Sequence, residues 1–202
     1  MVRWMTSDEL VAYPQALETM QSIVSDIQSG AEECIWLLEH PPLYTAGTSA
    51  KPQDLLVHDQ LPVFATGRGG QYTYHGPGQR VAYVMMDLNK RKPDLRWFVK
   101  ELEHWIIRAL AEFGLDSFQR DGRVGIWTNT PTGEAKIAAL GVRVSKWVTY
   151  HGIAINVHPN LAHFQGIVPC GLPQFGVTSL YDLGVDVTLE AVDKILKKTC
   201  TF

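Results

Sequence analysis

The chain has 202 residues, of which 46% are hydrophobic and 19% are charged, a composition typical of one globular domain with a sizeable core. The formal net charge of −3, with lysine and arginine scattered along the chain, argues against a general nucleic-acid-binding protein. Three cysteines without a CxxC pair do not indicate a disulfide framework or a thiolate zinc site. The sequence shows no secretory signal and no apolar run of about 18 residues, so we expect one cytoplasmic domain over residues 1–202 without membrane contact.

The first predicted element is a helix over residues 7–29, where apolar residues recur at helical spacing. Ser7 is its expected N-cap, Pro14 is expected to kink its early part, and Gly30 is expected to end it.

Short apolar segments separated by turn residues predict the strands of the fold. The first is a buried strand in which Cys34 fills the core, and a stiff, irregular loop over residues 39–48 follows it because of two prolines and several small residues. The last three strands are joined by short turns, which indicates antiparallel pairing. The predicted strands cover residues 34–38, 62–65, 80–88, 124–128, 135–144 and 148–157.

Two further helices are predicted, over residues 94–114 with Asp94 as N-cap, and over residues 188–200. Helices and strands do not alternate strictly, and the strands gather after the long helix. The pattern therefore favours an α+β fold with a mixed, largely antiparallel sheet flanked by helices, rather than a doubly wound nucleotide-binding fold.

Residues 67–79 form a glycine-rich segment that also carries Arg68, His75 and two tyrosines. Glycine allows the backbone to approach a ligand closely and leaves N–H groups available to it. A tight structural loop between two strands is the simpler interpretation, but the aromatic and charged residues favour a binding site.

Cys170 differs from the other cysteines because Pro169 and Gly171 flank it and place it on a loop. A small residue in a tight turn is the alternative to a nucleophile, which needs access and nearby N–H donors. A free thiol is mostly protonated at neutral pH and needs a cation or a base. Lys136 enters an apolar strand, where desolvation would let it exchange a proton with a thiol, although it could also reach out to water. The other candidate bases are His75, His151, His158 and His163.

Four groups of residues, taken in order, resemble the lipoyl(octanoyl) transferase family and cover most of the chain. They lie within residues 39–47, 68–79, 122–157 and 164–171. The resemblance implies the fold of the biotin and lipoate protein ligase catalytic domains. It also implies transfer of an octanoyl group from acyl carrier protein to a lysine of lipoyl domains, those of the 2-oxoacid dehydrogenase E2 subunits and the glycine cleavage H protein. No cofactor, metal or nucleic acid is implied.

The resemblance also implies the roles of individual residues. Cys170 matches the thiol that forms an octanoyl thioester, and Lys136 matches the lysine that favours its thiolate and shuttles its proton. Arg68 would hold its loop or meet the phosphate of the carrier. The residues that match the acyl-binding segments are Arg68, Gly69, Gly70, Gln71, Tyr72, Thr73, Tyr74, His75, Ala139, Leu140, Gly141, Gly152, Ile153 and Ala154.

Three other functions remain open from the sequence. An ATP-dependent lipoate or biotin ligase of the same fold would need no cysteine. A hydrolase would pair Cys170 with His75 or His151, and a catalytically inactive scaffold would only bind lipoyl domains. Metal binding by His158 and His163 has only their spacing in its favour.

Overall fold

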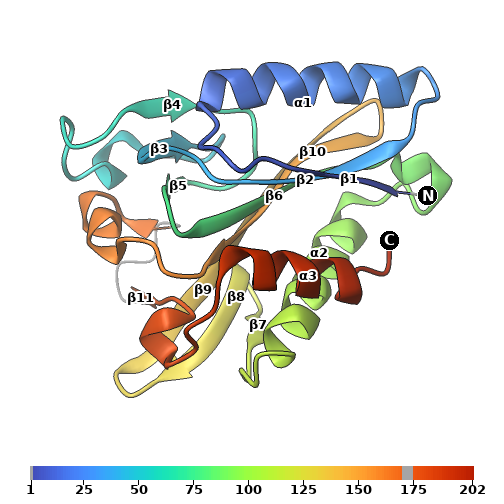
Figure 1. Cartoon of the computed structure of the whole chain (residues 1–202). Coiled ribbons are helices and arrows are strands. Elements are labelled where there is room, and N and C mark those ends of the chain that lie inside the picture. The colour runs from blue at the N-terminus through green and yellow to red at the C-terminus, as the bar shows by residue number, and fades with distance from the viewer. Residues whose placement is uncertain (1, 170–174) are drawn as a thin grey trace.

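The computed structural model describes residues 2–169 and 175–202, and within these it shows a mixed sheet of eight strands covered by helices on both faces (Figure 1). The strands follow the order β1-β2-β6-β10-β9-β8-β7, and β11 pairs with β9. All pairs are antiparallel except β1 with β2 and β11 with β9, which confirms the predicted α+β class. The bounds are β1 Val2–Thr6, β2 Glu33–Leu38, β6 Gln79–Met85, β7 Phe118–Arg120, β8 Arg123–Thr130, β9 Gly133–Ser145, β10 Val148–Asn156 and β11 Gly176–Val177.

A second, smaller sheet has the order β4-β3-β5. It comprises β3 (Leu43–Ala46), β4 (Val63–Ala65) and β5 (Tyr72–His75). The expectation of an irregular loop over residues 39–48 was therefore wrong for its second half, and the glycine-rich residues 67–79 contain a strand. Both short strands carry tyrosine and threonine, which suit a pleated surface, and the neighbouring glycine and proline hid this preference.

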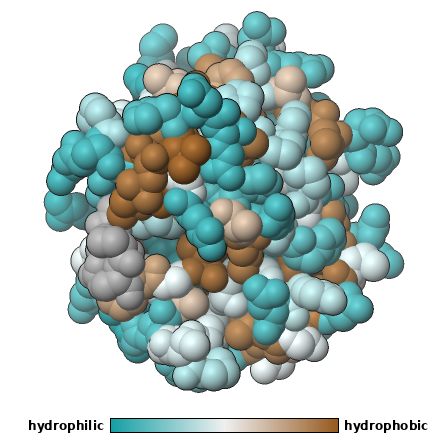
Figure 2. Space-filling view, turned by 90° about the vertical axis from the view of Figure 1, so that its left-hand side faces the viewer, coloured by the Kyte–Doolittle hydropathy of each residue, from teal (hydrophilic) through white to brown (hydrophobic). Residues whose placement is uncertain are grey.

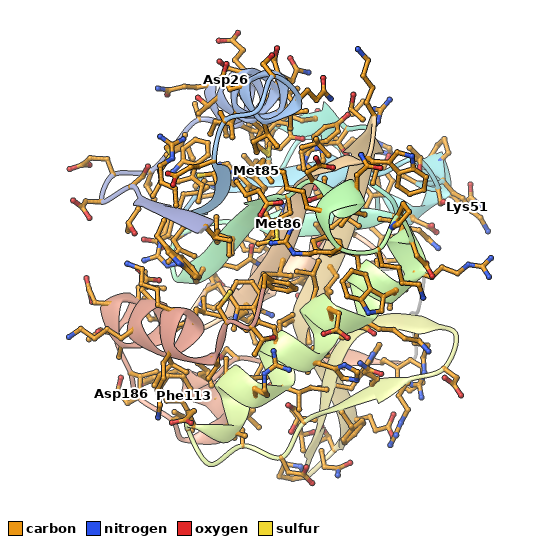
Figure 3. All side chains as sticks on the ribbon, turned by 90° about the vertical axis from the view of Figure 1, so that its right-hand side faces the viewer. Asp26, Lys51, Met85, Met86, Phe113 and Asp186 are labelled. Atoms are coloured by element: carbon orange, nitrogen blue, oxygen red, sulfur yellow. The ribbon has the colours of Figure 1, made fainter. Side chains whose placement is uncertain are left out.

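Helix α1 (Tyr13–Gln28) covers one face of the large sheet, and helices α2 (Leu95–Ala111) and α3 (Leu189–Thr199) cover the other (Figure 1). Successive side chains of a strand point to opposite faces, so each central strand contributes to two cores. Met85 belongs to the core beneath α1, and Met86 belongs to the core beneath α2 and α3 (Figure 3). Cys34 lies fully buried on the α1 side, as expected for a core-filling residue.

Helix α1 begins later than predicted, because the segment before it forms strand β1 and an extended connection. Ser7 is not its N-cap: the Ser7 N–H donates to Leu37 O at 2.9 Å, and the Ser7 hydroxyl accepts a hydrogen bond from Trp36 Nε1. The N-cap is Ala12, and Pro14 lies in the first turn of the helix, where its missing N–H and fixed φ are tolerated. Pro14 therefore starts the helix instead of kinking it.

Helices α2 and α3 are confirmed, and Asp94 is the predicted N-cap of α2, although α2 ends at Ala111, before the predicted residue 114. The Asp94 carboxylate accepts from Trp97 N–H at 3.0 Å, and the Thr188 hydroxyl accepts from Ala191 N–H at 3.2 Å. No helix in the described part of the chain is long and apolar enough to span a membrane. Short 3₁₀ helices lie at Pro52–Asp54, Leu88–Lys90, Leu161–Gly166 and Tyr181–Leu183.

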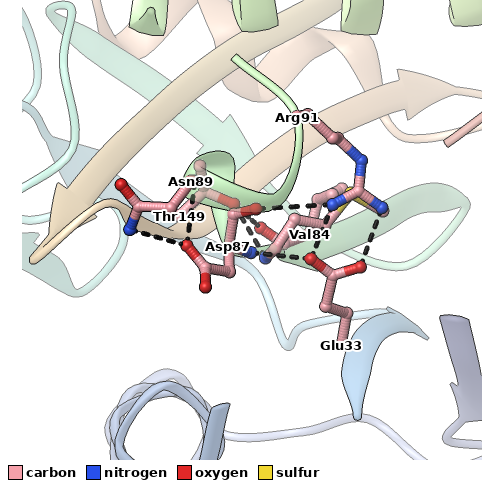
Figure 4. A network of polar contacts seen from close by, with 7 residues as sticks. Glu33, Val84, Asp87, Asn89, Arg91 and Thr149 are labelled. Carbon is pink, nitrogen blue, oxygen red and sulfur yellow. Dashed lines mark hydrogen bonds and ion pairs between the residues drawn. The ribbon is translucent and has the colours of Figure 1, made fainter. Parts of the chain in front are cut away.

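A carboxylate at the start of β2 ties this strand to the turn that follows β6 (Figure 4). Glu33 accepts both guanidinium N–H groups of Arg91, at 2.6 and 2.7 Å, and the N–H of Asp87 at 2.9 Å. Burial acts to raise the pKa of Glu33, but the Arg91 guanidinium and the Asp87 N–H outweigh it and hold that pKa below its ordinary value. The network therefore fixes the β1–β2 edge of the sheet to its centre.

Candidate active site

A cavity of about 50 Å³ lies between the small sheet and strands β6, β9 and β10. Every residue predicted to bind an acyl group lines it, except Gly69 and Tyr74. The lining residues are Tyr13, Thr45, Arg68, Gly70, Gln71, Tyr72, Thr73, His75, Val81, Tyr83, Ala139, Leu140, Gly141, His151, Gly152, Ile153 and Ala154. Three segments that are distant in sequence thus form one cavity.

The two exceptions lie beside the cavity and not in its wall. Gly69 lines an adjacent cavity of about 470 Å³, which shares Gly70, Gln71, Leu140 and Gly141 with the first. Tyr74 packs in a separate cluster, with its ring 5.3 Å from that of Phe164, because it alternates along β5 with the cavity-lining Thr73 and His75.

Arg68 fixes the glycine-rich segment against strand β3. Its guanidinium donates to the carbonyl oxygens of Thr45 at 2.7 Å, Gly69 at 2.9 Å and Gln71 at 2.9 Å, and also to the Thr45 hydroxyl. The residue is only 8% exposed. Of the two roles considered for Arg68, this geometry favours holding the loop.

Two glycines bring the backbones around the cavity close together. A Cβ atom on Gly152 would lie 2.2 Å from Ala82 O, and one on Gly141 would lie 2.9 Å from Arg68 Cδ. Leu140 and Gly141 lie inside the continuous strand β9, where they pair with Ile153 and Gly152, and not in a turn. The wall formed by β9 and β10 is therefore regular sheet.

Three buried histidines surround the end of the cavity nearest helix α1. His40 contacts Val11 O through Nδ1 at 2.6 Å and the Tyr83 hydroxyl through Nε2 at 2.7 Å, and His75 Nδ1 contacts Gln79 Oε1 at 2.7 Å. Burial lowers the pKa of both His40 and His151 to about 4. Burial and the neighbouring His40 hold the pKa of His75 well below its ordinary value. All three imidazoles are therefore neutral at physiological pH.

Lys136 lies on β9 near the opposite end of this wall and is 6% exposed, so it does not reach out to water. Its ammonium donates to Val124 O at 2.8 Å and lies 4.8 Å from the centre of the Trp127 ring. Gly125 gives it room, because a Cβ there would lie 2.9 Å from Lys136 Cε. Gly125 lies within residues 122–157, which carry the family resemblance, but the sequence did not indicate that it makes room for Lys136.

Cys170 lies outside the described residues, so its distance from Lys136 is not measured. Described residues on both sides of residues 170–174 have defined partners: the Val168 N–H donates to Asp54 O at 2.7 Å, and the Phe175 ring packs against Trp127 at 5.2 Å. Strand β11 then runs parallel to β9, with Val177 beside Lys136. Strand β11 therefore lies alongside Lys136, at the side of the molecule that is on the left in Figure 1 and faces the viewer in Figure 2.

Sequence reasoning missed several residues of the cavity wall. Val81 and Tyr83 alternate along a predicted strand, so their shared face could have been identified, but nothing in the sequence pairs that face with Tyr13 or Thr45. His151 was considered only as a base. For His158 and His163, the described residues contain no group of three His, Cys, Asp or Glu side chains placed to hold a metal ion.

Residues 12–201 match the family described as the lipoyl protein ligase A/B catalytic domain. The chain is 59% identical to the octanoyltransferase of Parvibaculum lavamentivorans over 201 residues, covering 97% of this chain and 89% of that protein. It is 58% identical to the octanoyltransferase of Rhodospirillum rubrum, covering 98% and 93% of the two chains.

Solved structures share the fold at much lower identity. A putative lipoate protein ligase from Thermoplasma acidophilum with bound lipoic acid superposes with a TM-score of 0.74 at 19% identity, covering 98% of this chain and 83% of the other. The biotin protein ligase of Aquifex aeolicus in complex with biotin and ATP gives a TM-score of 0.57 at 15% identity, with coverage of 98% and 68%. These likenesses confirm the predicted fold.

Proposed function

Since the chain belongs to the lipoyl protein ligase A/B catalytic domain family and is an octanoyltransferase, we propose that it transfers the octanoyl group through a thioester on Cys170, assisted by Lys136. The donor in this proposal is octanoyl-acyl carrier protein. The acceptors are lysines of lipoyl domains, those of the 2-oxoacid dehydrogenase E2 subunits and the glycine cleavage H protein. Residues 1–202 form one catalytic domain in this proposal, and the reaction takes place in the cytoplasm.

The observation that carries this proposal is the position of Lys136 at one end of the cavity wall. Lys136 is buried and hydrogen-bonded to Val124 O, and Ala139, Leu140 and Gly141 follow it along the same strand into the cavity. An acyl chain lying along β9 would therefore present its reactive carbon toward Lys136 and its tail toward the histidines. Val177 beside Lys136 supports the return of the Cys170 segment to this point.

The proposed reaction has two acyl-transfer steps, and in each step Lys136 gives back the proton that it takes up. The proton of the Cys170 thiol passes to the Lys136 nitrogen, and the thiolate attacks the octanoyl thioester carbonyl. The carrier thiol leaves as that thioester bond breaks and takes the proton from Lys136. The acceptor lysine amine then attacks the enzyme thioester and gives a proton to Lys136, which returns it to the departing Cys170 sulfur. An amide is formed, and the enzyme is regenerated.

The cavity provides an apolar slot for the tail, with Leu140, Ile153 and Ala154 in its wall. Burial of six methylenes stabilises the complex by about 5 kcal/mol at roughly 0.8 kcal/mol each. One methylene more or less changes binding by about 1–3 kcal/mol, so chain-length preference is expected to be real but incomplete.

The alternative from the same fold is an ATP-dependent ligase that activates a free acid. Solved ligases of this fold share only 12–20% identity with the chain, with 18% for lipoate-protein ligase A bound with ATP, whereas the octanoyltransferases share 52–59%. Attachment of free octanoate to a lipoyl domain only when ATP is added would favour the ligase.

Intact-mass measurement after mixing with octanoyl carrier protein tests the nucleophile. The natural chain is expected to gain about 126 Da, the mass of an added octanoyl group, and Cys170→Ala is expected not to gain it. Cys200→Ala is the matched control and should still be acylated, because Cys200 lies on the C-terminal side of α3, away from the cavity. A persistent mass gain in Cys170→Ala would show that another group carries the acyl chain.

Lys136→Met tests the proton transfer, because it keeps the length of the side chain and removes the amine. Acylation is expected to slow by about 10²–10⁴-fold, and alkylation of Cys170 by iodoacetamide is expected to move to higher pH. The exposed Lys51→Met is the control. An unchanged acylation rate and alkylation profile in Lys136→Met would contradict the proposed role.

A further inference from the structure

The backbone of His151 has an unusual conformation in the middle of strand β10. Its φ is +60°, a left-handed value that is uncommon for any residue other than glycine. The other described non-glycine residues with positive φ, Lys146 and Trp147, lie in the turn between β9 and β10, where such values are common. At His151 the pairing with β9 continues without a change of register. The regular pairing with β6 stops at Gly152, and Val84 O, which the register places opposite His151, accepts from the Thr149 hydroxyl. The conformation therefore coincides with a local interruption of the β6–β10 pairing.

The consequence of this conformation is a reversed side chain. Neighbouring residues of a strand point to opposite faces, and His151 pairs with Val142, whose side chain lies in the α2–α3 core. The His151 ring instead stacks on that of its neighbour Tyr150, with centroids 5.0 Å apart, and lies 6.0 Å from the ring of Tyr83. Both tyrosines belong to the α1 side of the sheet. The strained backbone thus brings the imidazole to the face that carries the cavity.

The Nε2 atom of the His151 ring lacks a hydrogen-bond partner among the described residues. His151 lines the cavity and is 2% exposed. The buried Gln71 Oε1, in the same cavity wall, also lacks a described partner. Backbone strain and an unsatisfied polar atom both destabilise the empty protein, so their coincidence at one residue points to a ligand that contacts it.

We propose that the acyl cavity ends in a polar subsite, in which His151 Nε2 hydrogen-bonds a neutral hydroxyl at the far end of a medium-chain acyl group, or a water molecule when that end is a methyl. This inference rests on the proposed function for the placement of the acyl carbon near Lys136. It extends that function to acyl chains that carry a hydroxyl on the terminal carbon.

The length of the cavity wall agrees with this placement. Ala139 pairs with Ala154, and Val142 pairs with His151, three residues further from Lys136 along β9. Three strand residues span about 10 Å at roughly 3.4 Å each. An extended eight-carbon chain spans about 8–9 Å, at roughly 1.2 Å per backbone-like single bond. Its last carbon therefore reaches the His151 position when its first lies beside Ala139. The Lys136 side chain extends toward this point, because a Cβ on Gly125 would lie 2.9 Å from both Lys136 Cε and Ala138 O.

A hydroxyl suits the subsite better than a charged group. A neutral imidazole nitrogen donates or accepts according to its tautomer, and a hydroxyl does both, so it matches either form. The neutral ring offers no countercharge to a carboxylate, and the guanidinium of Arg68 is already bonded to the carbonyl oxygens of Thr45, Gly69 and Gln71. The Tyr83 hydroxyl is bonded to His40.

The test compares 8-hydroxyoctanoyl and nonanoyl carrier protein, which differ only in a terminal hydroxyl or methyl, with octanoyl carrier protein as reference. We expect the natural chain to use the 8-hydroxyoctanoyl donor at least as well as the nonanoyl donor, measured as kcat/KM. In His151→Phe the ratio of the two values is expected to fall about tenfold or more, because the buried hydroxyl loses its partner. Tyr150→Phe, one residue away on the same strand, should leave the ratio unchanged.

His151→Gly is the second variant, since glycine adopts a positive φ without strain and keeps the strand intact. A ratio in the natural chain below about one tenth, or an unchanged ratio in both His151 variants, would overturn the subsite. Loss of all octanoyl transfer by the natural chain would instead contradict the proposed function. Calorimetric titration with free 8-hydroxyoctanoate and nonanoate would then still decide the subsite by their relative affinities.

Discussion

At the level of single residues, one glycine determines how closely the backbone can approach Lys136. Gly125 has a φ of +125°, and a Cβ on it would lie 2.9 Å from Lys136 Cε and 3.1 Å from Nζ. The Gly125 N–H also donates to the carboxylate of Glu103 at 3.3 Å. Gly125 therefore places Lys136 without touching a substrate, as a positioning residue.

Gly125→Ala is expected to lower kcat for octanoyl transfer about tenfold or more, because the methyl group displaces the ammonium from Val124 O. Gly133→Ala is the matched control, since Gly133 has a φ of +119° but nothing within 4 Å of its Cβ position. Gly133→Ala should lose about 1–2 kcal/mol of stability from the left-handed backbone, measured by urea unfolding. Gly125→Ala should lose more, because its methyl group also meets Ala138 O at 2.9 Å. Equal transfer rates in the two variants would show that Gly125 does not position Lys136.

The sequence predicted the residues of the cavity where they lie together in a motif, and failed where contact depends on tertiary packing. Residues 68–75, 139–141 and 152–154 were identified as continuous segments. Tyr13 and Tyr83 were not, because helical spacing and strand alternation indicate which face a residue occupies but not which distant element meets it. The backbone of His151 was equally inaccessible, since nothing in a local pattern predicts a positive φ at a histidine within a strand.

At the level of elements, length decided what could be predicted. Helices α2 and α3 and strands β8, β9 and β10 extend over many residues with clear periodicity, and their predictions are confirmed. The missed strands β1, β3, β5, β7 and β11 have two to five residues each, too few for alternation to stand out. Pairing with strands far along the chain stabilises β1, β3 and β5 instead.

The glycine-rich segment 67–71 depends on one side chain for its shape. Arg68→Lys is expected to increase amide hydrogen exchange across residues 67–71 and to lower kcat/KM about tenfold or more. The guanidinium reaches Gly69 O through one terminal nitrogen and Thr45 O and Gln71 O through the other, and the single nitrogen of a lysine cannot occupy both positions. Arg96→Lys, at an exposed position of α2, should change neither. Unchanged exchange in Arg68→Lys would show that the loop holds its conformation without the guanidinium.

At the level of the whole molecule, the cavity lies where the small sheet meets the large one, and its polar groups are buried between them. His40, His75 and His151 come from three separate segments and gather there around Tyr83. This arrangement buries the three imidazoles in and beside the cavity, and it therefore links the stability of the fold to their protonation.

Stability is therefore expected to fall when the pH is lowered below about 6.5, before most carboxylates are protonated. Burial lowers the pKa of His40 and His151 from 6.5 to about 4 and that of His75 well below its ordinary value, whereas the unfolded chain keeps ordinary values. Between the ordinary pKa and the lowered pKa values, the unfolded state thus binds more protons than the folded state. The stabilisation is complete above the ordinary pKa and is lost as the pH falls toward the lowered values. Each histidine contributes a slope of about 1.4 kcal/mol per pH unit, or up to about 4 kcal/mol per pH unit for the three together.

Urea unfolding between about pH 8 and about pH 5 measures this slope, and His151→Asn provides an internal check. Asparagine tolerates a positive φ and does not titrate. The slope of the unfolding free energy against pH is therefore expected to be smaller in this variant by about 1.4 kcal/mol per pH unit, the contribution of one histidine, while the fold is kept. Burial raises the pKa of Glu103 and of Asp193, so these carboxyl groups oppose the histidine slope, but they titrate alike in both chains and cancel in the comparison. A slope that is the same in the natural chain and in His151→Asn would contradict a buried neutral His151 at the junction of the two sheets.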